Sequence, residues 1–231
     1  MSAPSTMVSA SVLKSVPMFG SFPEEQLRAL ATLVVRRNVS RGSVVMAEGD
    51  PIDSLYIVVS GRLKVMMGEA DGKEVILGIL GPGEIFGEMG LIDDSPRSAN
   101  VVTIEACELL QIAKRDFKKC LAENFEMAMA VMRGLVKRLR DADRKIGSLA
   151  LLDVYGRVAR LLLDMSENVD GQKMVTKRLP KQDIAKMIGA SREMVSGVMR
   201  DLEMSGYFET RGSTIVLRDT GAPAAALIRR R

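Results

Sequence analysis

The chain has 231 residues, 47% of them hydrophobic, which is enough to bury one large core or two smaller ones. It contains no histidine and two cysteines, Cys107 and Cys120, which excludes histidine-based acid–base catalysis and histidine-ligated metals. Two cysteines are also too few for a four-thiolate metal site within one chain. We therefore expect neither an enzyme nor a metal-binding protein.

The net charge of +4 lies at the C-terminal end of the chain. Residues 153–231 contain 14 Lys and Arg against 10 Asp and Glu, whereas residues 1–152 contain 19 of each. Three of the excess charges are the terminal Arg229, Arg230 and Arg231. An excess this small permits nucleic-acid binding and is equally compatible with a solvated basic face.

No apolar run reaches the roughly 18 residues that a membrane helix needs. Residues 1–10 also lack the basic start and apolar stretch of a signal peptide. The two cysteines cannot build a disulfide framework, which suits a reducing compartment. These features predict a cytoplasmic protein that makes no membrane contact.

The first half of the chain changes from helical to strand periodicity. Residues 12–35 have helical spacing, and Pro23 opens the segment that carries Leu27, Leu30, Leu33 and Val34. From Val39 to Ile112 the pattern is one of short strands between turns of glycine, proline and aspartate. The expected strands are 43–46, 55–59, 63–66 and 74–77. This regular spacing predicts an antiparallel sandwich or barrel, and the lack of alternating helices argues against a Rossmann domain.

A long helix is expected over residues 114–148. Its positions Phe125, Met129, Met132, Val136, Leu139, Asp143 and Ile146 are separated by alternating steps of four and three. This heptad spacing favours two copies of the helix packed along each other, and the alternative is one helix lying on its own β-domain. The expected domains are a β-domain at 12–113, a dimerisation helix at 114–152 and a second domain at 153–231.

Residues 180–204 have the spacing of a helix-turn-helix. Pro180 suits a first helical turn, Gly189 suits the positive φ of a tight turn, and Ser191 can cap the second helix. Val195, Val198 and Leu202 are expected to form the buried stripe of that helix. Two strand-like segments then flank residues 211–213 as a hairpin or wing. Other amphipathic helix pairs can mimic part of this pattern, but the combination predicts DNA binding.

The second helix of such a motif enters the major groove with its N-terminal residues against base edges. Arg192 is suited to guanine and Glu193 to a cytosine amino group, and the alternative for Arg192 is a surface salt bridge. Ser196 and Arg200 lie further along the same face. The residues expected to contact phosphates are Lys181, Gln182 and Arg211.

Residues 87–99 resemble the phosphate-binding cassette of cyclic-nucleotide-binding domains, and we call them the cassette. Gly87 allows the backbone to approach a ligand closely. Glu88 can accept a hydrogen bond from a ribose hydroxyl. Arg97 would neutralise a phosphate and donate two hydrogen bonds to it, with Ser98 donating another.

In order and in motifs, residues 15–218 resemble the cyclic-AMP receptor and fumarate–nitrate regulator (Crp–Fnr) family of bacterial transcription factors. The resemblance rests on the glycine-punctuated strands, the cassette, the long helix running into residues 147–154, and Ser191-Arg192-Glu193. It implies an α+β fold with an N-terminal antiparallel, jelly-roll-like β-roll, a coiled-coil dimerisation helix and a C-terminal winged helix-turn-helix. It also implies a homodimer that binds double-stranded DNA and RNA polymerase. The N-terminal cluster cysteines of the nitrogen-fixation and anaerobic branch do not occur in this sequence, so a redox sensor is not expected.

The resemblance further implies a cyclic nucleotide effector, which is cyclic AMP, cyclic GMP or cyclic di-GMP. The residues expected to bind it are Gly87, Glu88, Met89, Arg97, Ser98, Ala99, Ala142 and Asp143. At the last two positions the cyclic-AMP receptor has a Thr-Ser pair that meets the adenine. A carboxylate can accept from both the N1–H and the 2-amino group of guanine, so Asp143 suggests a guanine nucleotide. A solvated or register-setting aspartate is the alternative.

A second departure from the receptor branch is Gly197, where that branch has another base-contacting arginine. We expect a palindromic operator with a receptor-like half-site that is relaxed at the corresponding base. The function that these features predict is a cyclic-nucleotide-responsive, DNA-binding transcription regulator. The alternative is a nucleotide-sensing regulatory subunit that acts on a protein partner without binding DNA.

Overall fold

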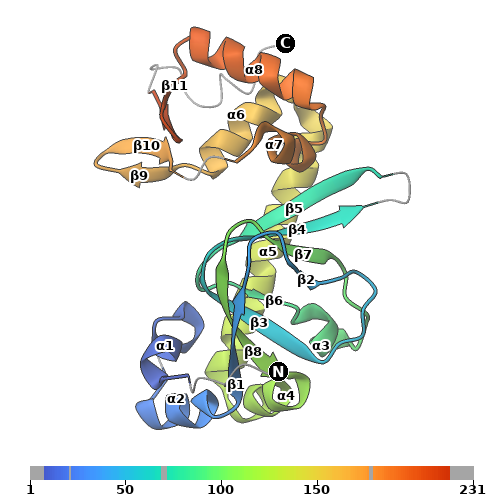
Figure 1. Ribbon diagram of the computed structural model, residues 1–231, viewed down its shortest axis with the longest axis vertical. Helices are drawn as coiled ribbons and strands as arrows, with labels where there is room; N and C mark the ends of the chain where they lie inside the picture. Colours follow the sequence, from blue (N-terminus) through green and yellow to red (C-terminus); the bar gives the residue numbers. More distant parts are fainter. Residues whose placement is uncertain (1–7, 21, 69–71, 177–178, 219–231) are drawn as a thin grey trace. The chain divides into compact units, whose positions relative to one another are not determined.

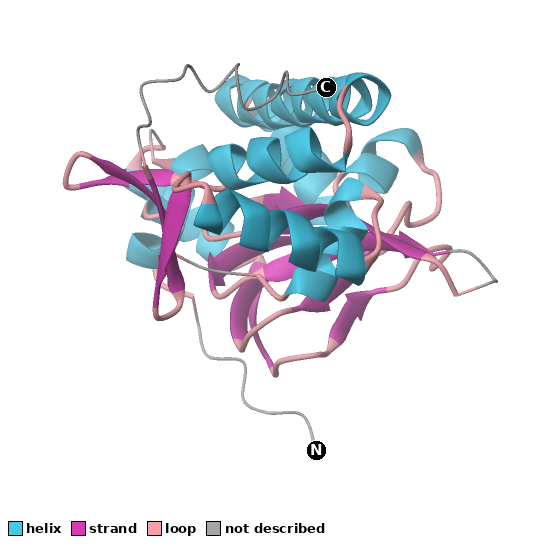
Figure 2. Ribbon diagram, turned by 90° about the horizontal axis from the view of Figure 1, so that it is seen from above, coloured by secondary structure: helices cyan, strands magenta, loops and turns pink. Residues whose placement is uncertain are grey.

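The computed structural model describes residues 8–20, 22–68, 72–176 and 179–218, so the terminal arginines lie outside the described residues. The chain forms two compact units, Met1–Val136 and Lys137–Arg231. Helices and strands occur in both units, which confirms the α+β class (Figure 2). The domain boundaries expected from the sequence remain predictions.

The first unit is built around two four-stranded antiparallel sheets (Figure 1). One has the strand order β1-β8-β3-β6 and the other the order β2-β7-β4-β5. The strands are β1 (Val34–Val39), β2 (Val44–Met46), β3 (Ser54–Ser60), β4 (Leu63–Gly68), β5 (Glu74–Leu80), β6 (Ile85–Phe86), β7 (Asn100–Thr103) and β8 (Cys107–Ala113). The short, turn-punctuated segments predicted an antiparallel sandwich or barrel, and the family resemblance implied a β-roll; the two sheets agree with both, and each of the four named strands is present.

Two hydrophobic cores lie on opposite faces of the sheet that contains β3 and β8. Because successive strand residues point to opposite faces, Ile57 belongs to one core and Val58 to the other. The Val58 core lies between the two sheets and includes Leu63, Phe86 and Val101. The Ile57 core lies between the sheet and the surrounding helices.

The sequence predicted a helical segment over residues 12–35. In the structure the last helix of this segment ends before residue 35, so the prediction is wrong at its C-terminal end. The helices are α1 (Ala10–Lys14), the 3-10 turn η1 (Pro17–Phe19) and α2 (Glu24–Ala31). Thr32 caps α2, and the strand β1 already begins at Val34, which pairs with Ile112 of β8. The β-branched pair Val34-Val35 therefore joins the sheet instead of extending the helix.

The expected single helix over residues 114–148 is in fact two helices, α4 (Lys114–Glu123) and α5 (Phe125–Leu151). Asn124 separates them with an extended backbone (φ −134°, ψ 100°). Its side-chain Oδ1 accepts a hydrogen bond from the Met127 amide at 3.0 Å, which caps the start of α5. The short helix α3 (Met89–Asp93) lies earlier, within the cassette.

The described residues of the second unit form three helices after α5 and a sheet of order β11-β12-β10-β9. Its elements are α6 (Val154–Asp164), β9 (Glu167–Val169), β10 (Gln172–Val175), α7 (Lys181–Ile188), α8 (Arg192–Met204), β11 (Phe208–Arg211) and β12 (Thr214–Leu217). The strand β9 lies in the polar segment 166–171. A tight turn at Asp170-Gly171, both with positive φ, lets this polar strand pair with β10.

Candidate ligand-binding and DNA-binding sites

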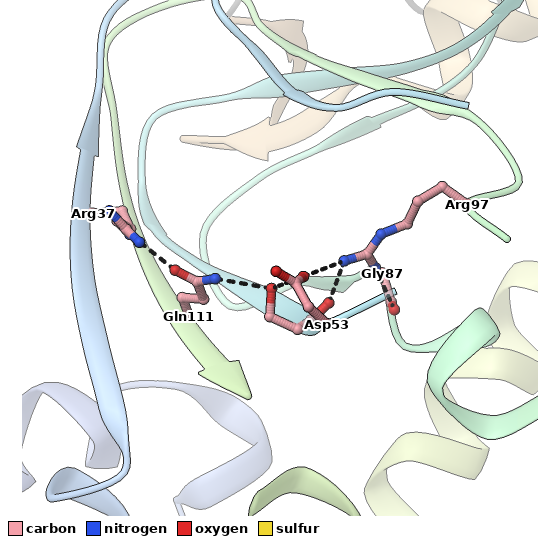
Figure 3. Close-up of polar contacts among 6 residues, drawn as sticks. Arg37, Asp53, Gly87, Arg97 and Gln111 are labelled. Atoms are coloured by element: carbon pink, nitrogen blue, oxygen red, sulfur yellow. Dashed lines mark hydrogen bonds and ion pairs between the residues drawn. The ribbon is translucent and has the colours of Figure 1, made fainter. Parts of the chain in front are cut away.

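Arg97 of the cassette is buried, with 6% of its surface exposed. Its guanidinium donates to the Ser54 carbonyl oxygen at 2.6 Å and to the Gly87 carbonyl oxygen at 2.9 Å. The same group lies 3.4 Å from Oδ1 of Asp53 (Figure 3). Arg97 therefore carries its positive charge into the roll, where two neutral carbonyls and one carboxylate contact it.

Gly87 has a φ of +83°, and a side chain at this position would collide with the arginine. A Cβ atom built there would lie 2.6 Å from Nη1 of Arg97 and 3.0 Å from Sδ of Met46. The sequence suggested that Gly87 gives a ligand access to the backbone. In the structure the group that approaches Gly87 closely is the Arg97 guanidinium.

The other predicted cassette residues lie in the same segment of chain as Arg97, from just before α3 to after it. Glu88, just before α3, is a buried carboxylate with 2% exposure, and Ala99 is buried in the core. Met89 and Ser98 are exposed. The structure therefore gathers the cassette residues in one place, whereas the contact of each with a nucleotide remains a prediction.

Asp94 ends α3 in the left-handed conformation, with φ 58°. Its carboxylate forms ion pairs with Lys114 at 2.6 Å and with Lys118 at 3.1 Å, both on α4. Hydrogen bonds from Lys114 and Lys118 hold the pKa of Asp94 below its ordinary value. The cassette is thus tied to α4 at the residue that follows α3.

Helix α5 has two apolar faces. Met127 and Val131 are buried in the core of the first unit, so part of the helix does lie on its own β-domain. The heptad positions form a second face, which we call the seam. Its exposed apolar members include Phe125 (72%), Leu139 (63%) and Ile146 (65%). Ala142 and Asp143 are also exposed on α5, and their expected contact with a nucleotide remains a prediction.

The helix-turn-helix has the local structure that its sequence predicts. Gly189 ends α7 with φ 63°, and Oγ of Ser191 accepts from the Met194 amide at 3.2 Å at the start of α8. Pro180 precedes α7 as its N-cap, one residue earlier than expected. The buried stripe of α8 contains Val195, Met199 and Leu202, so Met199 takes the place of the predicted Val198, which is half-buried.

Arg192 and Glu193 are exposed in the first turn of α8, as base-reading residues must be. Lys181, Ser196 and Arg200 line a shallow hollow that also includes Thr210 of β11. The wing strand is tied to α8 because Oε1 of Glu203 accepts from the Thr210 amide at 3.1 Å.

Arg211, which is expected to contact phosphate, is exposed on the wing and lies beside a carboxylate. It forms an ion pair with Glu209, which also pairs with Arg218. The hydrogen bond from Arg218 is the main cause that lowers the pKa of Glu209. Part of the positive charge of the wing is therefore offset by a carboxylate on the same hairpin.

Residues 36–124 match the family described as the cyclic nucleotide-binding domain, and residues 156–222 match the Crp-like helix-turn-helix domain. The chain is 30% identical over 213 residues to a CRP-like cAMP-activated global transcriptional regulator of Mycobacterium tuberculosis. That alignment covers 90% of this chain and 95% of the relative. The chain belongs to the Crp–Fnr family of transcription regulators. The expected resemblance is confirmed, and this Crp–Fnr chain is a cyclic-nucleotide-responsive, DNA-binding regulator.

Two other similar proteins are also described as global regulators. The cAMP-activated global transcriptional regulator Vfr of Pseudomonas aeruginosa is 33% identical over 192 residues, which is 80% of this chain and 90% of Vfr. The c-di-GMP responsive global regulator CLP of Xanthomonas campestris has a similar structure, with a TM-score of 0.72 and 32% identity. The match covers 86% of this chain and 100% of the CLP chain. FixK2 of Bradyrhizobium japonicum shares the fold, with a TM-score of 0.74 at 22% identity, over 86% of this chain and 98% of FixK2.

Sequence reasoning missed three residues of this Crp–Fnr regulator that the structure brings to the two sites. They are Asp53 beside the cassette, Asp94 within it, and Arg157 on α6, whose Nη1 donates to the Ile188 carbonyl oxygen at 2.9 Å. The sequence offered one indication of Asp94 as a residue that can end a helix, because aspartate is one of the few residue types that tolerate positive φ. Among the described residues, no helix is both long and apolar enough to cross a membrane.

Proposed function

We propose that this regulator acts as a homodimer in which each β-roll binds a cyclic nucleotide at Arg97 and the paired α8 helices bind a palindromic operator. The observation that carries the proposal is the burial of Arg97, of which 6% is exposed in a loop bounded by Gly87. A buried cation held mainly by neutral carbonyls is stabilised further when an anion reaches it. The phosphate of a cyclic nucleotide is such an anion.

The seam on α5 supports the dimer. Phe125, Met132, Val136, Leu139 and Ile146 are each between 47% and 72% exposed in the single chain. Apolar side chains repeated every three or four residues are buried when two such helices pair. The dimer would present two α8 helices to successive major grooves, about 34 Å apart.

The residues proposed to recognise DNA divide into two groups. Arg192 and Glu193 would read base edges, with Ser196 and Arg200 further along α8. Lys181, Gln182 and Arg211 would contact phosphates and so set the position of α8 without reading sequence. We also propose RNA polymerase as a partner, because it acts at the promoters that a transcription regulator controls.

The effector is proposed to be cyclic AMP, cyclic GMP or cyclic di-GMP. The M. tuberculosis and P. aeruginosa relatives are described as cAMP-activated, whereas the Xanthomonas relative is described as c-di-GMP responsive. Asp143 favours a guanine nucleotide because its carboxylate can accept from both donors on the guanine edge. Calorimetry with all three nucleotides on wild type and Asp143→Ala tests this preference. Stronger binding of cyclic AMP that is unchanged in Asp143→Ala would refute it.

DNA binding and nucleotide sensing are tested together by fluorescence anisotropy on an operator selected from random duplexes. We expect wild-type affinity to change when the effector is added, because an effector shifts an equilibrium by its differential affinity for the two states. Arg192→Ala should lose sequence selectivity, whereas Glu167→Gln on β9 is the matched control and should keep it. A wild-type protein that binds nucleotide but no duplex would instead favour a regulatory subunit acting on another protein.

A further inference from the structure

Asp53 stands immediately before β3 and faces the cassette. Its backbone carbonyl accepts from the Lys114 amide at 2.7 Å, so its main chain is fixed at the start of α4. Its side chain is 81% exposed, whereas the Arg97 side chain that it contacts is 4% exposed. The Asp53 carboxylate therefore lies at the surface in contact with the buried guanidinium.

A line of hydrogen bonds holds the Asp53 carboxylate in place (Figure 3). The hydroxyl of Ser54 donates to Oδ1 of Asp53 at 2.8 Å and accepts from Nε2 of Gln111 at 2.9 Å. Oε1 of Gln111 accepts in turn from Nε of Arg37 at 2.9 Å, which orients the Gln111 amide. The carboxylate is thus positioned from the β1 and β8 strands rather than left to swing in solvent.

The bonds of Arg97 show what this carboxylate does. The two shorter hydrogen bonds, at 2.6 and 2.9 Å, go to the neutral carbonyls of Ser54 and Gly87. These fix the guanidinium without reducing its charge. Asp53 supplies a carboxylate at 3.4 Å, so of these three contacts it is the one that offsets the positive charge of Arg97.

We propose that Asp53 is a positioning residue that sets the effector affinity by competing with the nucleotide phosphate for Arg97. The inference rests on the proposed nucleotide site. A phosphate bound to Arg97 would place two anions on one cation, and the repulsion between them lowers the affinity for the nucleotide. Asp53→Asn removes the charge and keeps a carbonyl oxygen that can accept from Ser54.

The expected size follows from Coulomb's law. In a largely solvated setting, the repulsion between two like charges about 6 Å apart weakens binding by a factor of about three to ten. Asp53→Asn should therefore bind the effector about three- to tenfold more tightly than wild type. Asp53→Glu keeps the charge and should bind no more tightly than wild type. The difference between Asp53→Asn and wild type should shrink in 1 M salt, because exposed charges are screened.

Isothermal titration of the full-length dimer with cyclic AMP, cyclic GMP and cyclic di-GMP measures these affinities. Glu108→Gln is the matched control, since it removes one carboxylate from the same roll at the ion pair with Arg36. It should leave the effector affinity unchanged. A gain in affinity separates competition from a structural role, because loss of a merely structural contact weakens binding. Thermal melting of each variant checks that the roll remains folded.

The outcomes are distinguishable. Tighter binding by Asp53→Asn alone, with salt sensitivity, supports the inference. If wild type binds a nucleotide and Asp53→Asn binds it equally or more weakly, the inference is wrong and the proposed function stands. If wild type binds none of the three nucleotides at millimolar concentration, the proposed function fails and the inference fails with it.

Discussion

Nη1 of Arg97 donates to the carbonyl oxygen of Gly87 at 2.9 Å, and a Cβ atom on Gly87 would lie 2.6 Å from the same nitrogen. The glycine therefore serves the arginine in two ways. Its backbone, with a φ of +83°, directs the carbonyl oxygen toward the arginine. Its missing side chain leaves room for the guanidinium. Both features position Arg97 in the site that is proposed to hold the effector phosphate.

Gly87→Ala should displace Arg97 and weaken effector binding. The positive φ alone costs about 1–3 kcal/mol for a residue other than glycine. The collision with Nη1 adds to this cost, so the free energy of unfolding in urea should fall by more than that of a matched control. Gly42→Ala is the control, because Gly42 has φ +78° and, apart from its chain neighbours, no described atom lies within 4 Å of its Cβ position. Equal losses in the two variants would show that the contact with Arg97 is unimportant.

How far the sequence predicts this structure depends on the physical signal at each residue. The turns and caps were predictable, because Gly189 and Ser191 carry local signals that do not depend on distant residues. The apolar spacing of the strands likewise predicted the roll. Met199 was missed because helical periodicity allows a buried residue three or four positions after Val195.

The partners of Arg97 could not be predicted in the same way. The Ser54 and Gly87 bonds use backbone carbonyls, which every residue possesses, so no residue type marks them. Asp53 lies 44 residues from Arg97 in the sequence. Only the pairing of β3 with β8 and β6 fixes the start of β3 beside the cassette. The sequence could therefore identify the cation of the site but not the groups that hold it.

Ser191→Ala should weaken the recognition helix. Its Oγ accepts from the Met194 amide, one of the amides at the start of α8 without an intrahelical partner. Loss of such a cap costs about 0.5–2 kcal/mol. Urea unfolding of Ser191→Ala should show this loss, and Ser191→Asn should retain most of the stability because asparagine also caps helices. A neutral Ser191→Ala would mean that the cap bond does not contribute.

The ion pairs of Asp94 should make stability depend on pH. Lys114 and Lys118 lower the folded-state pKa of Asp94, so the stabilisation is complete above the ordinary carboxyl pKa. It is lost as the pH falls through the lowered value. Asp94→Asn, which tolerates the φ of 58°, should be less stable than wild type at pH 7, and the difference should disappear in acid. A difference in unfolding free energy that persists unchanged at pH 2 would contradict this account.

Leu139→Glu should convert the proposed dimer to a monomer. Leu139 is 63% exposed in the single chain, and pairing of the seam would place its side chain against the second copy. A buried, unpaired carboxylate at that position would strongly oppose association. Sedimentation equilibrium measures the change in mass. Lys137→Glu adds a negative charge to α5 outside the seam, and this variant should remain dimeric. A wild-type protein that sediments as a monomer would exclude the seam as an interface.

Gly197 should determine how strictly one base pair of each half-site is read. Apart from its chain neighbours and the backbone of α8 itself, no described atom lies within 4 Å of its Cβ position, so the helix has space for a side chain there. Gly197→Ala should raise the free energy of unfolding by about 0.5–1 kcal/mol through helix propensity, without changing the selected operator. Gly197→Arg adds a guanidinium that can hold a guanine through two hydrogen bonds, and each such contact discriminates by about 1–3 kcal/mol. Selection from random duplexes should therefore return one additional restricted base per half-site for Gly197→Arg alone. If wild type already selects that base with full stringency, another residue reads it and the prediction is wrong.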